Sequence, residues 1–183
     1  MPAGHVRHGL ISHGQQHGGI TMTFLIRIPM AALLIASALM SVTASAQDIA
    51  LLTVSGADGS EIKSYDLNAL KALGVESFET TTIWTEGKQT FTGVPLLALF
   101  EDIEVSHGEV DAIAVNDYSV PIPVSDAVEG GPMVAFEVDG KPMSIRDKGP
   151  LWIVYPYDSK TDYQSETIYS RSIWQLDRLR IQQ

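Results

Sequence analysis

The sequence predicts an α+β fold built from mixed β-sheets with two or three short helices, and three observations point to this class. Short apolar or alternating runs recur after residue 47 and are separated by turn residues, which is typical of a sheet-rich domain. Helix signals are few and short, so the regular βαβα alternation of a doubly wound sheet is not expected. Asp139-Gly140 lies between two apolar runs and predicts a tight hairpin.

The first predicted elements are a strand and a helix. Residues 49–54 form an apolar run that ends in a turn-rich stretch, which indicates a strand followed by a turn. Asp66 can accept N–H groups at a helix start, and leucines on one face follow it. Gly74 can end this helix in the left-handed conformation.

A second strand and a second helix are expected next. Residues 76–84 are rich in threonine and alternate in polarity, which favours a strand, and 86–88 supply a turn. Pro95 fits the first turn of a helix because its missing N–H would have no partner there. This helix is expected to end near Asp102.

The second half of the region predicts mainly extended segments, namely residues 110–115, 118–124, 133–138, 141–143, 151–155 and 173–181. Between them, residues 125–128 predict at most one helical turn. The run at 151–155 is continuously apolar, which predicts a buried central strand. In the last segment Arg178 and Arg180 are expected to face water.

The N-terminal region predicts a secretory signal peptide over residues 1–46. Arg27 precedes an apolar run, and a small-residue motif ends at Ala46, so cleavage is expected between Ala46 and Gln47. The apolar run is shorter than the roughly 20 residues that a spanning helix needs, so no permanent membrane span is expected after cleavage. We therefore expect a periplasmic domain over residues 47–183.

Met22 offers an alternative start, which would leave residues 1–21 upstream of the true protein. That segment holds four histidines, and a metal site there is the competing interpretation. Glycine and histidine without hydrophobic periodicity predict no packed element that could fix metal ligands. The sequence therefore predicts no metal site.

Composition limits the chemistry that the domain can perform. After cleavage the chain has ten basic and 22 acidic residues, which gives a net charge of −12. This charge disfavours nucleic acid as a partner. The chain has no cysteine, so disulfides, a lipoprotein anchor and a thiol nucleophile are not expected. His107 is the one histidine after residue 47, which leaves little for a histidine metal centre or a catalytic triad.

Five sequence blocks follow one another in a fixed order: FTGVPLLALF (91–100), NDYSVPIP (116–123), MVAFEVDGKPM (133–143), GPLWIVYP (149–156) and SIWQL (172–176). In this order and spacing the chain resembles the molybdopterin-binding domain of the sulfite-oxidase-like oxidoreductases. The resemblance covers roughly residues 77–181. It implies the sulfite-oxidase-type fold and, in members that perform molybdenum chemistry, a metal held by a cysteine thiolate.

The chain departs from that family at the residues that would hold the cofactor. The resemblance places the cysteine on the segment before the GVPL block, and here that segment is Thr80–Trp84. A threonine hydroxyl is a hard donor with a far higher pKa than a thiol, so it cannot replace the thiolate. The family's glycine-containing loop and its basic residue before the final tryptophan are replaced by an acidic, aromatic loop at 157–163 and by Ile173. The chain therefore resembles a short exported form that lacks the molybdenum ligand.

Aromatic and polar residues near the family's cofactor position are the candidate ligand-binding residues. They are Thr81, Trp84, Tyr157, Tyr163, Arg171 and Trp174, with Tyr155 and Tyr169 close to them. Rings give flat contact area, and an arginine can clamp a carboxylate. In the competing interpretation Tyr155 and Trp174 belong to the core and the others decorate a surface loop. No catalytic residue is predicted.

We therefore expect an exported, non-catalytic binding or sensory module, with a small ligand or an envelope protein as its partner. No cofactor is predicted. The first alternative is a molybdopterin-dependent oxidoreductase that holds its cofactor without a cysteine. The second alternative is a structural subunit of an envelope complex.

Overall fold

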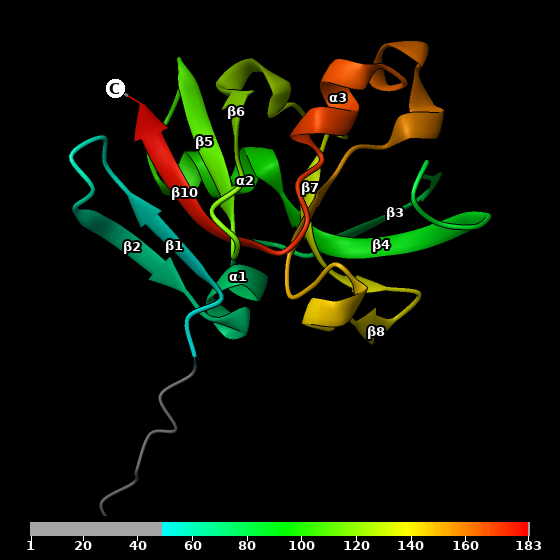
Figure 1. The fold of residues 1–183 in the computed structure, drawn as a ribbon, viewed down its shortest axis with the longest axis horizontal. Coiled ribbons are helices and arrows are strands. Elements are labelled where there is room, and N and C mark those ends of the chain that lie inside the picture. Colours follow the sequence, from blue (N-terminus) through cyan, green and yellow to red (C-terminus); the bar gives the residue numbers. More distant parts are fainter. Residues whose placement is uncertain (1–48, 183) are drawn as a thin grey trace, which may run out of the picture. The chain divides into compact units, whose positions relative to one another are not determined.

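The structure, a computed structural model, describes residues 49–182, which belong to the unit formed by residues 45–183 (Figure 1). The predicted signal peptide, its cleavage between Ala46 and Gln47 and the N-terminal histidines lie outside the described residues. Two five-stranded sheets and three short α-helices make up the described part. This mixed architecture agrees with the α+β class that the sequence predicts.

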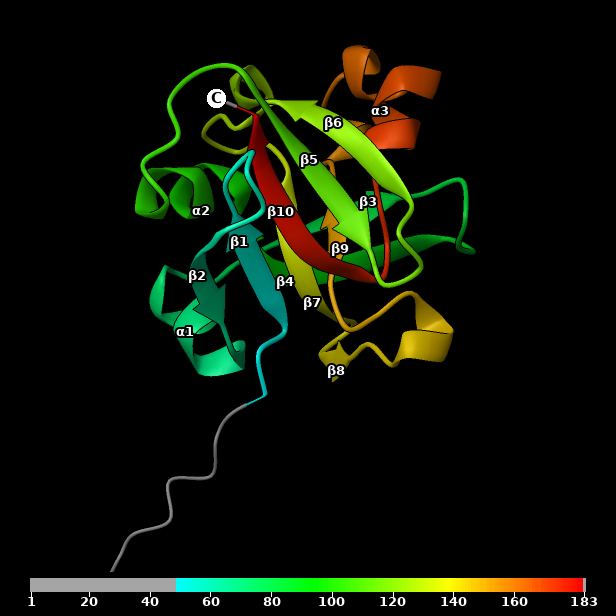
Figure 2. The same cartoon turned by 60° about the vertical axis from the view of Figure 1, so that its left-hand side comes forward.

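The first sheet has the strand order β2-β1-β10-β5-β6, which Figure 2 shows most clearly. Its strands are β1 (Leu52–Ser55), β2 (Glu61–Tyr65), β5 (Glu109–Ala114), β6 (Ser119–Pro123) and β10 (Leu176–Gln182). β1 and β10 pair in parallel, whereas the other neighbours are antiparallel. β6 lies at one edge, where Pro121 and Pro123 are tolerated because an edge strand leaves one row of N–H groups unpaired.

The second sheet is antiparallel and centres on β4 and β7. Its strands are β3 (Glu76–Thr81), β4 (Lys88–Pro95), β7 (Met133–Val138), β8 (Lys141–Pro142) and β9 (Trp152–Val154). β8 and β9 pair with different halves of the same edge of β7. In the hairpin between β7 and β8, Asp139 and Gly140 both have positive φ, 50° and 71°, which confirms the predicted tight turn.

The prediction of a central strand over residues 151–155 is wrong in one respect. The segment is fully buried, as its apolar sequence indicates. However, β9 pairs along its length with β7 alone, and its other edge carries the isolated bridge between Trp152 and Trp174. This segment is buried because it packs against the rest of the domain. Its apolar sequence indicated burial correctly but did not indicate how many strands pair with it.

Three helices connect the sheets, namely α1 (Leu67–Ala72), α2 (Leu96–Asp102) and α3 (Glu166–Arg171). The Asp66 carboxylate caps α1 by accepting from Ala69 N at 2.7 Å, as predicted, and Gly74 has a φ of 110°. Pro95 lies at the N-cap of α2, one position earlier than expected. The sequence analysis did not identify α3, whose N-cap Ser165 accepts from Ile168 N at 3.4 Å.

Short 3-10 turns occupy much of the remaining chain, at Val124–Asp126, Ile145–Asp147, Tyr157–Ser159 and Thr161–Tyr163. The first of these matches the single helical turn predicted near residues 125–128. The last two lie in the loop that the sequence describes as acidic and aromatic, and they place its tyrosines inward. Both Tyr157 and Tyr163 are buried.

The inner faces of the two sheets pack around one hydrophobic core that also takes in the helices. Alternate residues supply it: in β1, for example, Leu52 and Val54 are fully buried between partly exposed neighbours. The close contact of β4 with β7 explains Gly93, since a Cβ there would lie 2.2 Å from the Val134 carbonyl oxygen. This glycine of the GVPL block is therefore required by packing.

The last strand begins at Leu176, three residues later than predicted. Arg178 is partly exposed and bonds Asp117 and Asp177, whereas the Arg180 Nε is buried without a hydrogen-bond partner among the described residues. The expectation that both arginines face water is therefore only partly met. Within residues 49–182, no helix has the length and apolar character needed to cross a membrane.

Candidate functional site

Trp84 lies in the loop that joins β3 to β4, at the centre of an aromatic cluster. Its ring contacts four others edge-on, with centroids 5.6 to 6.2 Å apart: those of Trp152, Tyr157, Tyr169 and Trp174. Such tilted contacts are the favoured geometry for aromatic pairs. The structure thus brings together Trp84, Tyr157 and Trp174 of the predicted site.

A cavity of about 270 Å³ opens beside this cluster. It is lined by Trp84, Ala114, Asn116, Tyr118, Tyr169, Ser170, Ser172, Ile173, Trp174 and Gln175. None of these side chains carries a charge. The walls combine aromatic faces with amide and hydroxyl groups, and Trp174 and Tyr118 are 38% and 54% exposed. We name this space the neutral cavity.

The sequence analysis missed the wall that the turn between β5 and β6 contributes. Asn116 and Tyr118 lie on that turn and reach the cavity because the first sheet places it beside α3 and Trp174. The available signal was a tyrosine two residues after an asparagine in the second sequence block. Without the topology, nothing in the sequence connects that block to Trp84.

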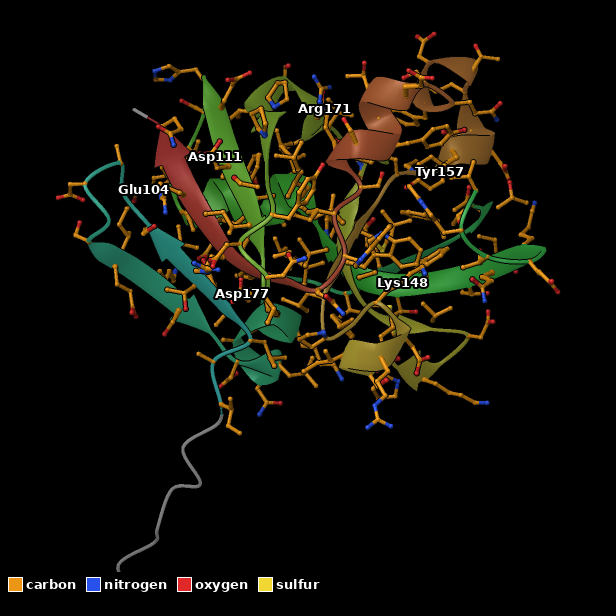
Figure 3. The ribbon with its side chains drawn as sticks, in the orientation of Figure 1. Glu104, Asp111, Lys148, Tyr157, Arg171 and Asp177 are labelled. Carbon is orange, nitrogen blue, oxygen red and sulfur yellow. The ribbon has the colours of Figure 1, made fainter. Side chains whose placement is uncertain are left out.

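Arg171 is the last residue of α3, and its guanidinium bonds another side chain of the protein. Its Nη1 donates to Asp126 Oδ2 at 2.9 Å, and the Tyr155 hydroxyl donates to the same oxygen at 2.7 Å. Figure 3 shows Arg171 at the end of α3 that faces the first sheet. Arg171 is not among the residues that line the neutral cavity. Arg171 was predicted to bind the carboxylate of a ligand, but in the structure it already binds the carboxylate of Asp126.

The buried tyrosines are held by hydrogen bonds of their own. The Tyr157 hydroxyl donates to Ser172 Oγ at 2.6 Å, and the ring of Tyr163 lies 5.5 Å from that of Tyr155 with Lys160 Nζ 4.1 Å from its centroid. Burial raises the pKa of the Tyr155 and Tyr157 hydroxyls above the ordinary tyrosine value, so both stay protonated. These groups are suited to fixing α3 and its neighbouring turns.

Thr80 and Thr81 are both engaged with Asp158. Thr80 is fully buried and its Oγ1 accepts from Asp158 N at 3.1 Å. The Thr81 hydroxyl and backbone N–H donate to the two oxygens of the Asp158 carboxylate at 2.6 and 2.9 Å. These bonds hold the pKa of the Asp158 carboxyl below its usual range. They join the start of the hairpin to the loop at 157–163.

The segment Thr80–Trp84 does not fit the metal ligand that the family resemblance implies. Its hydroxyls are hard oxygen donors, and both Thr80 and Thr81 are already bonded within the protein. The Trp84 ring fills space between Trp152 and Trp174. The residues present therefore offer no equivalent of a thiolate, and we derive no step through a molybdenum cofactor.

Comparison with known proteins bears on the fold. No family model matches the sequence, and no curated protein matches it. Among solved structures, the sulfane dehydrogenase SoxCD from Paracoccus pantotrophus is similar, with a TM-score of 0.52 and 16% sequence identity. The match covers 71% of this chain and 37% of that one, so this chain spans well under half of the length of its neighbour. The likeness shows that the two proteins share a fold over the matched part of this chain.

Proposed function

We propose that this domain is an exported, non-catalytic binding or sensory module that receives a small neutral ligand in the neutral cavity. The observation that carries the proposal is the position of Trp84. It occupies the segment matched to the family's metal ligand, and its ring forms a wall of a cavity that contains no charged side chain. The fold thus has a cavity at this position, and its wall is an aromatic ring where the family would have a metal ligand.

The walls of the cavity indicate the class of ligand. Aromatic faces favour flat apolar surfaces. Asn116 Oδ1 accepts from Tyr118 N, Ser170 Oγ donates to Thr167 O and Gln175 Nε2 donates to Ile145 O. The Asn116 amide N–H groups and the Ser170 and Gln175 oxygens are therefore the groups that can exchange hydrogen bonds with hydroxyl or amide groups of a ligand. Burying a charge without a partner is costly, so uncharged walls select against ions. The volume of about 270 Å³ suits a single ring or one sugar-sized unit.

Ligand-observed NMR with a mixture of neutral monosaccharides and acetylated amino-acid amides tests this assignment. We expect saturable binding of at least one neutral probe, and Trp174→Ala should weaken it about tenfold or more because an aromatic wall is lost. Ile62→Ala is the matched control, since Ile62 is an exposed apolar residue on β2 outside the cavity lining. Equal binding by both variants would assign the ligand to another surface.

Export is part of the proposal and has its own test. Expression of the whole coding sequence in a Gram-negative host, followed by fractionation and N-terminal sequencing, should yield periplasmic protein that starts at Gln47. Protein that keeps residues 22–46 would contradict cleavage at Ala46.

The second candidate is a molybdopterin-dependent oxidoreductase, and the likeness to a sulfane dehydrogenase favours it. Metal analysis of protein purified from cells supplied with molybdate separates the two candidates. Our proposal expects molybdenum far below one atom per chain, because no thiolate is present to hold it. Stoichiometric molybdenum would replace our proposal with this one.

A further inference from the structure

A second cavity, of about 420 Å³, lies beside β8 and differs from the neutral cavity in its charge. It is lined by Thr85, Gln89, Val138, Lys141, Pro142, Met143, Arg146, Asp147, Lys148 and Trp152. Three of these side chains are cationic, and one is anionic. Figure 3 places Lys148 close to the second sheet and well away from Arg171. We name this space the cationic cavity.

The three cations of this cavity form no ion pair with any described residue. Residues 49–182 contain ten lysines and arginines, and five of these form ion pairs with carboxylates, namely Lys63, Lys71, Lys88, Arg171 and Arg178. Of the five others in the described part, three line the cationic cavity. A domain with 22 acidic residues therefore leaves three positive charges unneutralised around one recess.

The one carboxylate in the lining is held within its own turn. Asp147 Oδ2 accepts from the Ser144 hydroxyl at 2.8 Å. No ion pair joins Asp147 to Arg146 or Lys148 among the described residues. Arg146 and Lys148 are thus not neutralised by the acidic residue between them in the sequence.

The turn that carries Arg146 and Lys148 is fixed by several contacts. Lys148 adopts a left-handed backbone with a φ of 74°, and its carbonyl accepts from Gln175 N at 2.9 Å. The Gln175 side chain in turn donates to the Ile145 carbonyl at 2.7 Å. At Gly149 an added Cβ would lie 2.1 Å from the Met143 carbonyl oxygen, so the turn packs directly on the β8 segment. These contacts fix the backbone that carries Arg146 and Lys148 beside the cavity.

The base of the cavity is part apolar and part polar. Lys148 Nζ lies 5.7 Å from the ring centroid of Trp152 and 5.1 Å from that of Trp174, so its charge rests over two indole faces. Val138, Pro142 and Met143 supply apolar contact. Gln89 also lines the cavity, and its buried Oε1 has no hydrogen-bond partner among the described residues. A ligand that contains both a charged and an apolar part would match these walls.

We propose that the cationic cavity binds a small organic oxyanion, in which a carboxylate or phosphate meets Lys141, Arg146 and Lys148 and a compact apolar body lies against Trp152. This site is separate from the neutral cavity and selects the opposite class of ligand. It does not depend on the function proposed above. Arg146 can bond two oxygens of such a group at once, and the lysines supply further charge.

Titration with benzoate, phenyl phosphate and inorganic phosphate, followed by tryptophan fluorescence and calorimetry at low ionic strength, tests the proposal. We expect saturable binding of at least one of the two aromatic anions, with a change in emission because Lys148 lies over Trp152 and Trp174. Benzoate and phenyl phosphate distinguish a carboxylate site from a phosphate site. Benzamide has the same ring without the charge and should bind at least about tenfold more weakly than benzoate.

The variants remove one charge at a time. Arg146→Gln and Lys148→Asn should each weaken anion binding about tenfold, the cost of one charged hydrogen bond. Asparagine is chosen at Lys148 because it tolerates the left-handed backbone. Lys160→Gln is the matched control, since it removes an equal charge from outside the lining and should change affinity less than about twofold. Unfolding curves verify that each variant is folded.

Two results would overturn this site. One is the lack of saturable binding by all three anions. The other is an equal loss of affinity in Lys160→Gln and Arg146→Gln, which would mean that only the overall charge matters. Neither result concerns neutral probes or Trp174→Ala, so failure here is distinguishable from failure of the neutral cavity.

Discussion

The two sides of the aromatic cluster differ in how their polar groups are used. On the tyrosine side, the hydroxyls of Tyr155 and Tyr157 are bonded to Asp126 and Ser172, and Arg171 is paired with the same Asp126. On the tryptophan side, Trp174 is 38% exposed and lines the neutral cavity. Lys148 lies over the indoles of that side without a carboxylate partner among the described residues.

This difference separates residues that hold the domain together from residues that are available to a ligand. An arginine or tyrosine whose bonds are satisfied inside the protein contributes mainly to stability, because a ligand would have to break those bonds first. A side chain that lines a cavity and lacks an internal partner can bind without that cost. Replacements on the tyrosine side should therefore lower stability, whereas those on the tryptophan side should lower affinity.

On the tyrosine side, the largest expected effect is that of Asp126→Ala. It leaves the Arg171 guanidinium and the Tyr155 hydroxyl without their shared acceptor, and we expect a loss of about 3 kcal/mol in the free energy of unfolding. Urea denaturation measures it. Asp126→Asn keeps an acceptor without the charge and should lose less. A loss below about 0.5 kcal/mol for the alanine variant would show that the tyrosine side is not structural.

A smaller effect is expected for Tyr157→Phe, which removes one buried hydroxyl and leaves the ring in place. Ser172 Oγ loses its donor at 2.6 Å, so we expect a loss of about 1.5 kcal/mol. Tyr118→Phe removes a hydroxyl from an exposed ring and serves as the control, with no measurable change in stability. If the two variants were equally stable, the Tyr157 bond would not distinguish the two sides.

Trp174→Ala should have little effect on stability for so large a truncation. The ring is 38% exposed, so we expect a loss of about 1 kcal/mol, well below the roughly 3–5 kcal/mol of a buried tryptophan. Trp152→Ala supplies that comparison, because Trp152 is 1% exposed. Thermal and urea unfolding of both variants measure the difference. A Trp174 variant as unstable as the Trp152 variant would assign both rings to the core.

The smallest effect concerns pH. The Thr81 bonds lower the pKa of the Asp158 carboxyl in the folded state below its usual value, so the ionised carboxylate stabilises the fold above that usual value. This contribution is lost as the pH falls below the usual value and through the lowered pKa. Compared with Asp158→Asn, the wild-type protein should be more stable at neutral pH by about 0.5 kcal/mol.

Urea unfolding of both proteins from neutral pH to acid measures how this advantage changes. The gap should close as the pH falls into the acid range. A gap that stays constant over that range would show that the Asp158 charge does not contribute.

Local signals in the sequence predicted much of the fold. Asp66, Gly74 and the Asp139-Gly140 pair report backbone geometry within a few residues, and the structure contains the expected cap and turns. The signals for β2 and α3 were weaker. Charged and polar residues interrupt β2, and α3 is six residues long with one buried residue. Such elements form because the rest of the domain packs around them.

The aromatic residues of the candidate site could be predicted from the sequence, but the role of Arg171 could not. The ring types near Trp84 and Trp174 indicated an aromatic cluster, and the structure brings these two rings to 5.6 Å. The sequence could not reveal that Asp126, 45 residues before Arg171, would pair with it. Lys148 was overlooked for the same reason, since its position over Trp174 depends on a turn that no local pattern specifies.

The position of β10 has a consequence for how the domain is made. The last strand of the chain inserts between β1 and β5 in the middle of its sheet, so β1 cannot reach its parallel neighbour until residues 176–182 have been synthesised. Until then β1 and β5 each have an unpaired edge, and such an edge can pair with another chain.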